Sequence, residues 1–225
     1  MCGRFTQKYT WQELAELYRL NQTPRNIRPA YNVCPTDPVG VLVPGSNGLS
    51  YMPMRWGLIP RWWKKSLKEL PATFNARVET VSEKPMFRDA FGRNRCLIPA
   101  SGYYEWQTVG KEKQPYYITP RNGSILSFAG LWEEWERGGE VIESCAIITT
   151  EANDLMAEYH DRMPVILHPK DYDLWLDPGV QDPSLLEPLL RPCPSDDLEV
   201  YPVSRLVNDP RHEDPKCVEA EPEQT

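Results

Sequence analysis

The sequence predicts a single α+β domain in which strands dominate. Its 225 residues are enough to bury one substantial core. Its 23 prolines interrupt the chain too often for long helices, and its eight tryptophans and eleven tyrosines favour strands. We therefore expect one compact, strand-rich domain over residues 2–212, with short flanking helices. Residues 213–225 have almost no apolar content and are predicted to form an acidic, disordered tail.

One amphipathic helix is predicted from about Thr10 to Leu20. Thr10 and Glu13 form a capping-box pattern, and apolar residues recur after it at helical spacing. Shorter helices are predicted over residues 152–159, 170–175 and 183–190, which begin near Asn, Asp, Pro or Ser. Because these helices do not alternate regularly with strands, a doubly wound sheet is disfavoured.

Five stretches have the composition of strands. They are "VGVLV" (39–43), "LSYMPMRWGLI" (49–59), "PYYIT" (115–119), "SILSFAGLW" (124–132) and "CAIITT" (145–150). The dipeptides Asn47-Gly48 and Asn122-Gly123 predict two hairpin turns.

Several classes of protein are disfavoured by what the sequence does not contain. It has no run of about 20 apolar residues and no apolar signal-peptide region, so we expect a cytosolic protein. Its six cysteines are scattered without a C-x-x-C pair, which predicts reduced thiols and no metal site. A monomer is expected because no heptad pattern is present.

The net charge of −7 conceals an uneven distribution of charged residues. Residues 1–121 carry 18 Lys and Arg against 9 Asp and Glu, which gives +9. Residues 122–225 carry 7 against 23, which gives −16. This asymmetry is compatible with a basic binding face on an otherwise acidic protein, although solvated charge explains it equally.

Cys2 would become the N-terminal residue if Met1 were removed. It would then hold a thiol and an α-amine on adjacent carbons, and both are partly nucleophilic near neutral pH. The amine condenses with an aldehyde to an imine, and the thiol can close on the same carbon to give a thiazolidine. Alternatively, the thiolate could attack an amide with the amine as base. An incidental small residue is the third interpretation.

Two further motifs contain polar residues that could take part in binding or catalysis. "FNARVET" puts Asn75, Arg77 and Glu79 at alternate positions, where they would share one face of an extended segment and hold an anion. "GYYEW" sets Glu105 between aromatic residues, which would raise its pKa and suit a general acid or base. A polar strand face and a solvated edge-strand glutamate are the respective alternatives.

"YHDRMPVIL" and "RWGLIPRWWKKSLK" complete the set of candidate sites. His160 is a candidate proton shuttle and Arg162 a candidate phosphate ligand, although a structural histidine is the commoner case. The second stretch interleaves cations with Trp56, Trp62 and Trp63, which are the ingredients of single-strand binding. A protein–protein patch or a half-buried aromatic cluster fits the same composition.

Six motifs in this order, "MCGRF", "YNVCPT", "RWGLIP", "NARVET", "GYYEW" and "HDRMPVIL", resemble the SRAP family, the SOS-response-associated peptidases that sense abasic sites. The resemblance runs from residue 2 to "PVSRLVN". It implies a compact fold whose strands curl around a central channel. It also implies a DNA-repair role in the cytoplasm, at the nucleoid if the source is bacterial.

The resemblance implies a reaction as well. Met1 would be removed, and Cys2 would form a thiazolidine with the ring-opened abasic sugar in single-stranded DNA, including single-strand/duplex junctions. Asn75 would position the sugar, Glu105 would move protons during formation and reversal of the crosslink, and His160 would assist the imine chemistry. No metal or organic cofactor is implied.

The resemblance also implies a DNA-binding surface. Arg4, Arg77 and Arg162 would bind phosphates, and Trp62 or Trp63 would act as a wedge beside the lesion.

Two other functions remain open at the level of the sequence. Class II glutamine amidotransferases also begin with Met-Cys-Gly, so an N-terminal-nucleophile amidohydrolase that uses Cys2 is the alternative. The third interpretation is a DNA- or protein-binding module in which Cys2 has no chemical role. The peptidase label of the family leaves open whether the protein removes its own Met1.

Overall fold

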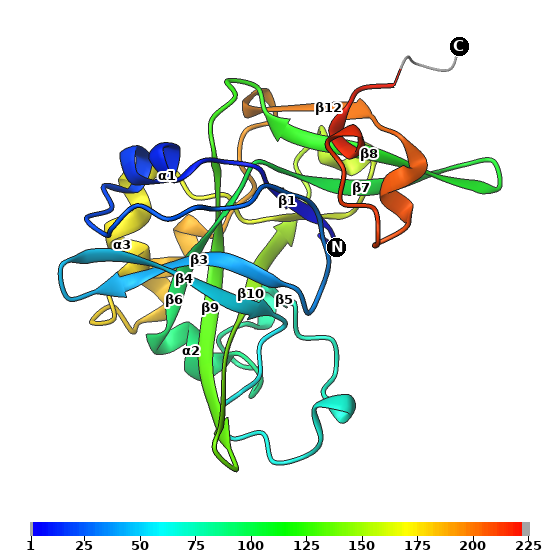
Figure 1. The fold of residues 1–225 in the computed structure, drawn as a ribbon. Helices are drawn as coiled ribbons and strands as arrows, with labels where there is room; N and C mark the ends of the chain where they lie inside the picture. The colour runs from blue at the N-terminus through cyan, green and yellow to red at the C-terminus, as the bar shows by residue number, and fades with distance from the viewer. Residues whose placement is uncertain (1, 222–225) are drawn as a thin grey trace.

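A computed structural model describes residues 2–221 and shows the predicted α+β fold. Five of its strands form a closed barrel, because β9 pairs with both β6 and β10 and so completes the ring β10-β4-β3-β6-β9. These strands are β3 (Pro38–Gly45), β4 (Gly48–Trp56), β6 (Arg95–Ala100), β9 (Leu126–Arg137) and β10 (Glu140–Glu151). The ring is the curled sheet that the family resemblance implied (Figure 1).

Two short strands extend the barrel along β10. They are β5 (Asn75–Arg77), which is parallel to β10, and β11 (Arg162–Pro164), which is antiparallel to it. Two motifs distant in the sequence, "NARVET" and "HDRMPVIL", therefore meet at one strand.

A second sheet of five antiparallel strands lies above the barrel in Figure 1. Its order is β12-β8-β7-β1-β2, with β1 (Phe5–Gln7), β2 (Ala30–Val33), β7 (Gly102–Val109), β8 (Glu112–Pro120) and β12 (Leu198–Pro202). Phe5 and Tyr103 of this sheet pack with Val41 and Phe128 of the barrel, and Cys2 belongs to the same buried cluster. The N-terminal segment is thus part of the interface between the two sheets.

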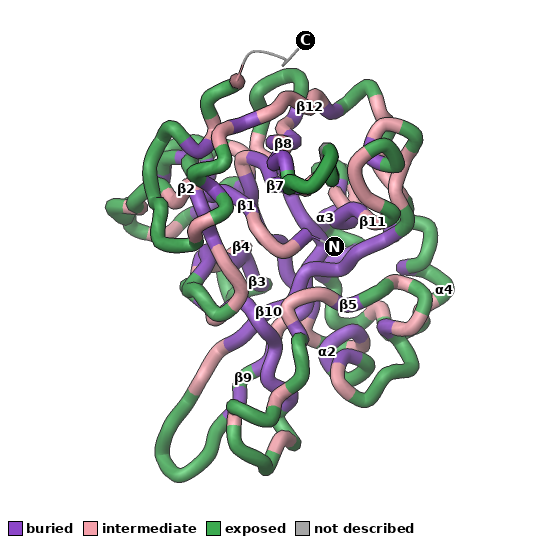
Figure 2. The backbone as a smooth tube through the Cα atoms, turned by 90° about the vertical axis from the view of Figure 1, so that its right-hand side faces the viewer, coloured by how far each residue is buried: buried purple, intermediate pink, exposed green. Residues whose placement is uncertain are grey.

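The helices pack against a separate core cluster. They are α1 (Trp11–Tyr18), α2 (Arg88–Arg93), α3 (Tyr172–Leu176) and α4 (Pro183–Leu186). Leu14, Phe91 and Trp175 from these helices pack with Leu42 and Leu97 of the barrel. Figure 2 shows the buried stretches concentrated in the strands between these layers, with exposed loops around them.

The predicted helix near the N-terminus is confirmed, including its cap. The Thr10 hydroxyl accepts a hydrogen bond from the Glu13 amide, and the Glu13 carboxylate accepts one from the Thr10 amide. Arg19 then takes a left-handed conformation and ends the helix.

Two local predictions were wrong. Asn122-Gly123 does not make a hairpin, because β8 and β9 on either side of it belong to different sheets. Residues 152–159 form only a 3-10 turn at Met156–Glu158. The Asn153 side chain accepts from the Met156 amide, as an N-cap does, and donates to the Cys193 carbonyl, so the helical turn begins only after Asn153.

The expected disordered tail also differs from the structure. Residues Pro215–Val218 form a 3-10 turn, Cys217 is fully buried, and Ala220 makes a β-bridge with Val203. Cys217 packs with Tyr104 and Tyr117, so two or three apolar residues anchor a segment whose average composition is acidic. The part of the predicted tail beyond residue 221 lies outside the described residues.

Residues 2–221 contain neither a helix suited to cross a membrane nor a cluster of side chains suited to hold a metal. No helix in this range is long and apolar enough to cross a membrane. The same range contains no group of three or more His, Cys, Asp or Glu side chains arranged to hold a metal ion.

Candidate active site

Cys2 is buried at the point where the N-terminal segment meets β5. Its carbonyl oxygen accepts a hydrogen bond of 2.8 Å from the Asn75 side-chain amide. Its side chain has no solvent exposure, and burial, with the nearby charge of Glu105, raises the pKa of its thiol well above the ordinary value. Cys2 follows Met1 in this chain, so its nitrogen is an amide until Met1 is removed.

Glu105 supplies a buried carboxyl beside this cysteine. Its side chain is only 3% exposed, and burial raises its pKa to about 7, with a smaller contribution from the charge of Asp161. The predicted shift in this pKa is therefore confirmed. The solvated-edge alternative was wrong because β7 lies between β8 and β1. A carboxyl with this pKa can both give and take protons near neutral pH.

The "NARVET" motif is divided between two elements. Asn75 and Arg77 lie at alternate positions of β5, with Asn75 bonded to Cys2 and Arg77 exposed. Glu79 follows in the 3-10 turn Val78–Thr80, so it does not continue the strand face as predicted. Its carboxylate instead forms two hydrogen bonds with the Arg162 guanidinium, which lower the pKa of Glu79.

His160 lies on a segment that runs against the second sheet. Gln107 of β7 donates to the Glu158 carbonyl at 3.1 Å, and the Tyr159 ring packs on Tyr116, which is paired with Glu105 across β7 and β8. These contacts bring His160 to the same side of the molecule as Glu105.

The His160 ring can exchange partners on protonation. Its Nδ1 atom is 2.9 Å from the Arg162 amide nitrogen and 2.7 Å from an Asp161 carboxylate oxygen. An unprotonated Nδ1 accepts from Arg162, whereas a protonated one donates to Asp161. Burial lowers the pKa of His160 and so favours the unprotonated form.

The three arginines predicted to bind phosphate have different environments. Arg4 donates to the Asn32 side chain at 2.6 Å and to the Val207 carbonyl at 2.7 Å. Arg162 donates to Glu79 and to the Thr149 carbonyl. Only Arg77 is classed as exposed, so Arg4 and Arg162 are partly engaged with the protein itself.

Two buried polar atoms near Cys2 have no hydrogen-bond partner among the described residues. They are Asn75 Oδ1, whose own amide group donates to the Cys2 carbonyl, and the Tyr103 hydroxyl, which belongs to the same buried cluster as Cys2. Such atoms are rare in folded proteins because an unpaired buried polar group is destabilising. Their concentration here indicates a place built for a polar ligand.

Tyr103 was not selected from the sequence. It is fully buried and lies two residues before Glu105 on β7, so both side chains project from the same face of the strand. The period-2 alternation of a strand through "GYYEW" is the signal that would have found it.

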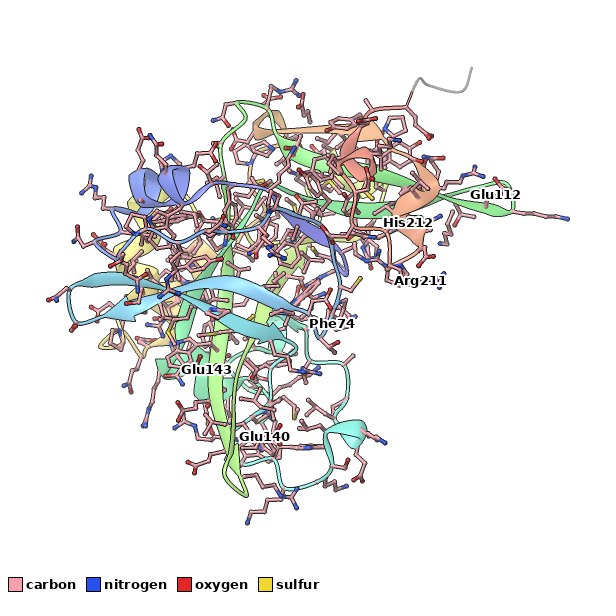
Figure 3. All side chains as sticks on the ribbon, viewed as in Figure 1. Phe74, Glu112, Glu140, Glu143, Arg211 and His212 are labelled. Carbon is pink, nitrogen blue, oxygen red and sulfur yellow. The ribbon has the colours of Figure 1, made fainter. Side chains whose placement is uncertain are left out.

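The residues after Pro60 form an exposed loop that carries the predicted stacking and basic groups. Trp62 is 42% exposed, Trp63 is half-buried, and their ring centroids are 6.0 Å apart. Lys64, Lys65 and Lys68 are exposed. We call this loop the tryptophan loop (residues 61–68). The chain that follows it leads to Phe74, the residue before Asn75 (Figure 3).

Two of the predicted cations at this surface are engaged by the protein. Arg61 bonds the buried Glu133 carboxylate, and Arg55 bonds the Gly57 carbonyl. A separate cavity of about 870 Å³, between the Tyr172 and Leu198 regions, is lined by none of the predicted site residues.

The sequence model of the SOS response associated peptidase (SRAP) family matches residues 1–210. The chain belongs to this family. The match confirms the resemblance inferred from the six motifs, and it covers all the candidate site residues of the SRAP domain.

This chain is also similar to individual members of the SRAP family. The abasic site processing protein YoqW of Bacillus subtilis is 40% identical over 224 residues, which cover 98% of this chain and all of that protein. The abasic site processing protein YedK of Escherichia coli is 30% identical over 226 residues, with 97% and 99% covered. A crystal structure of a protein from Bacteroides thetaiotaomicron superimposes with a TM-score of 0.86 at 27% identity, over 98% of this chain and all of that one.

Proposed function

We propose that this protein processes abasic sites in single-stranded DNA by capturing them covalently through Cys2. One observation carries the proposal: the Asn75 amide holds the Cys2 backbone beside the buried carboxyl of Glu105. The SRAP relatives YoqW and YedK, which are abasic site processing proteins, support it, as do the unpartnered polar atoms of Asn75 and Tyr103.

The reaction begins when hydrolysis of the Met1–Cys2 peptide bond exposes the Cys2 amine. This amine adds to the C1′ aldehyde of the ring-opened sugar, and the adduct loses water to form an imine. The Cys2 sulfur then bonds to the imine carbon while the thiol proton passes to the nitrogen, which closes a thiazolidine. One water is released, and no oxidant, reductant, metal or organic cofactor is consumed.

Glu105 and His160 would move the protons in these steps. With a pKa of about 7, Glu105 can give a proton to the departing hydroxyl, take one back from the nitrogen as the imine forms, and later relay the thiol proton to that nitrogen. Run in reverse, the same transfers open the ring and release the aldehyde, so the crosslink can reverse itself. His160, held mainly unprotonated, is a second proton acceptor at the imine stage.

Asn75 and the basic residues would orient the DNA. The free Asn75 carbonyl oxygen can accept a hydrogen bond from a sugar hydroxyl, while its amide continues to hold Cys2. Arg77 and the lysines of the tryptophan loop face solvent, where they can neutralise phosphates without reading sequence. Arg4 adds a charge two residues from Cys2, and Arg162 adds one next to His160. Monomeric state and cytosolic location remain predictions.

The test is a denaturing gel after incubation with a single-stranded oligonucleotide that carries one abasic site. We expect a heat-stable shifted band with the wild-type protein, and none with Cys2→Ala or with an intact oligonucleotide. If no band forms although mass spectrometry shows that Met1 is absent, covalent capture is excluded. Release of ammonia from glutamine would then favour the amidohydrolase alternative.

A further inference from the structure

One face of β9 makes a row of hydrogen bonds to the tryptophan loop. Glu133 Oε2 accepts from Arg61 Nε at 2.8 Å, and Trp135 Nε1 donates to the Trp63 carbonyl at 2.8 Å. Arg137 Nη1 donates to the carbonyls of both Lys64 and Lys65, the second at 3.1 Å. Glu133, Trp135 and Arg137 alternate along the strand, so they project from one face of it.

The strand that carries these side chains is firmly held. Glu133 and Trp135 are 2% and 4% exposed, and residues 133–137 pair directly with residues 140–144 of β10 in the barrel. The far end of the loop is closed by a capping box between Ser66 and Glu69. The loop backbone is thus fixed at both ends and in the middle.

Most of these bonds are made to backbone carbonyls of the loop, so the side chains that could contact DNA stay exposed to solvent. The carbonyls of Trp63, Lys64 and Lys65 are bound by β9, while the side chains of Trp62, Lys64 and Lys65 are exposed. Without these contacts, a loop of this kind would have to lose conformational entropy each time it bound a ligand. With them, the backbone on both sides of Trp62 is set beforehand, and the Trp62 indole itself donates to the Pro85 carbonyl at 3.3 Å.

We propose that β9 is a clamp that holds the tryptophan loop in its DNA-binding conformation, with Trp135 and Arg137 as positioning residues and Glu133 as their buried anchor. The inference rests on the proposed function. A Trp62 ring fixed in one direction can stack on one side of a lesion only, so the clamp determines on which side of the abasic site duplex DNA is accepted.

The test uses Trp135→Phe and Arg137→Ala, which remove the donors without removing a buried charge. Trp132→Phe and Glu136→Ala are matched controls, because they make similar changes at positions of β9 that alternate with the clamp. Limited trypsin digestion followed by mass spectrometry measures the rate of cleavage after Lys64 and Lys65. Fluorescence anisotropy measures binding of oligonucleotides that carry a tetrahydrofuran abasic analogue and a duplex on either the 5′ or the 3′ side.

We expect the clamp variants to be cleaved at Lys64 and Lys65 about fivefold faster, because a local opening becomes easier. Their preference between the two junctions should fall about threefold or more as Trp62 loses its fixed direction. Both controls should behave as wild type. Unchanged cleavage would show that β9 does not hold the loop, and faster cleavage with an unchanged junction preference would show that the hold does not serve recognition.

These readouts are independent of the covalent chemistry. The tetrahydrofuran analogue has no aldehyde, so it cannot form a thiazolidine, and its binding reports on non-covalent recognition without the Cys2 reaction. Failure of the gel assay would therefore overturn the function of Cys2, whereas failure of the anisotropy assay would overturn the clamp.

Discussion

Cys2, Asn75 and Glu105 come from three distant segments and meet in the interior, whereas Trp62 and Lys64 come from one short stretch that faces solvent. The chemical site needs burial, because desolvation is the main cause that raises the pKa of the Glu105 carboxyl to about 7. The tryptophan loop needs exposure, because its groups must reach bases and phosphates. The residues that carry out the reaction are therefore separate from those that recognise DNA, and a substitution can alter one of these two functions without the other.

The largest expected effect is on the reaction. Glu105→Gln keeps the shape of the side chain but removes its proton transfer, so single-turnover crosslinking should slow by about 10²-fold or more. Binding of the tetrahydrofuran strand should be unchanged. Glu112→Gln, at the tip of the same β7–β8 hairpin, is the control and should crosslink at the wild-type rate (Figure 3). Equal rates for both variants would remove Glu105 from the mechanism.

The burial of Glu105 should also be visible in stability. Its folded-state pKa of about 7 lies above the ordinary value of 4.5, so folding favours the protonated carboxyl. The stability from this group is complete below pH 4.5 and is lost as the pH rises through 7, a change of about 3 kcal/mol.

Glu105→Gln cannot ionise and should escape that loss. Its free energy of unfolding in urea should exceed that of wild type by about 3 kcal/mol at pH 8, with the difference shrinking towards pH 4.5. An identical pH dependence in the two proteins would mean that the carboxyl is solvated in the folded state. The active site would then not lower the free energy of unfolding of the protein.

Recognition should respond to a different substitution. Trp62→Ala should weaken binding of single-stranded DNA by about 1–3 kcal/mol, the value of one base–aromatic stack. The urea midpoint should change little, because the Trp62 ring is exposed and its one side-chain hydrogen bond, to the Pro85 carbonyl, lies at the surface. Trp63 is half-buried, and its indole donates to the Ser66 carbonyl, so Trp63→Ala should lower stability as well. If Trp63→Ala alone weakened binding, Trp63 would be the wedge.

The two regions also differ in how much the sequence could predict. The tryptophan loop was evident, because its cations and indoles are consecutive and need no tertiary structure to be recognised. Cys2, Asn75 and Glu105 were found as separate motifs, but their meeting depends on the pairing of β5 with β10 and on the packing of the two sheets. Such long-range contacts leave no local pattern.

Other contacts were missed for the same reason. In the sequence, Glu133 is indistinguishable from a solvent-exposed strand glutamate. It is buried and paired with Arg61 only because β9 closes the barrel. Cys217 lies in an acidic segment whose composition predicts disorder, yet a few apolar contacts with Tyr104 and Tyr117 hold that segment in place. Average composition cannot show which single residues will find a partner.

The smallest expected effect concerns the exposed lysines. Each phosphate contact on a single strand contributes about 0.7 to the slope of log affinity against log salt concentration. The double variant Lys64→Gln/Lys65→Gln should therefore reduce that slope by up to about 1.4 and weaken binding most at low salt. Lys111→Gln, in the distant β7–β8 turn, is the control. A slope unchanged in the double variant would place the DNA backbone away from these lysines, and the exposure of the loop would then serve stacking by Trp62 alone.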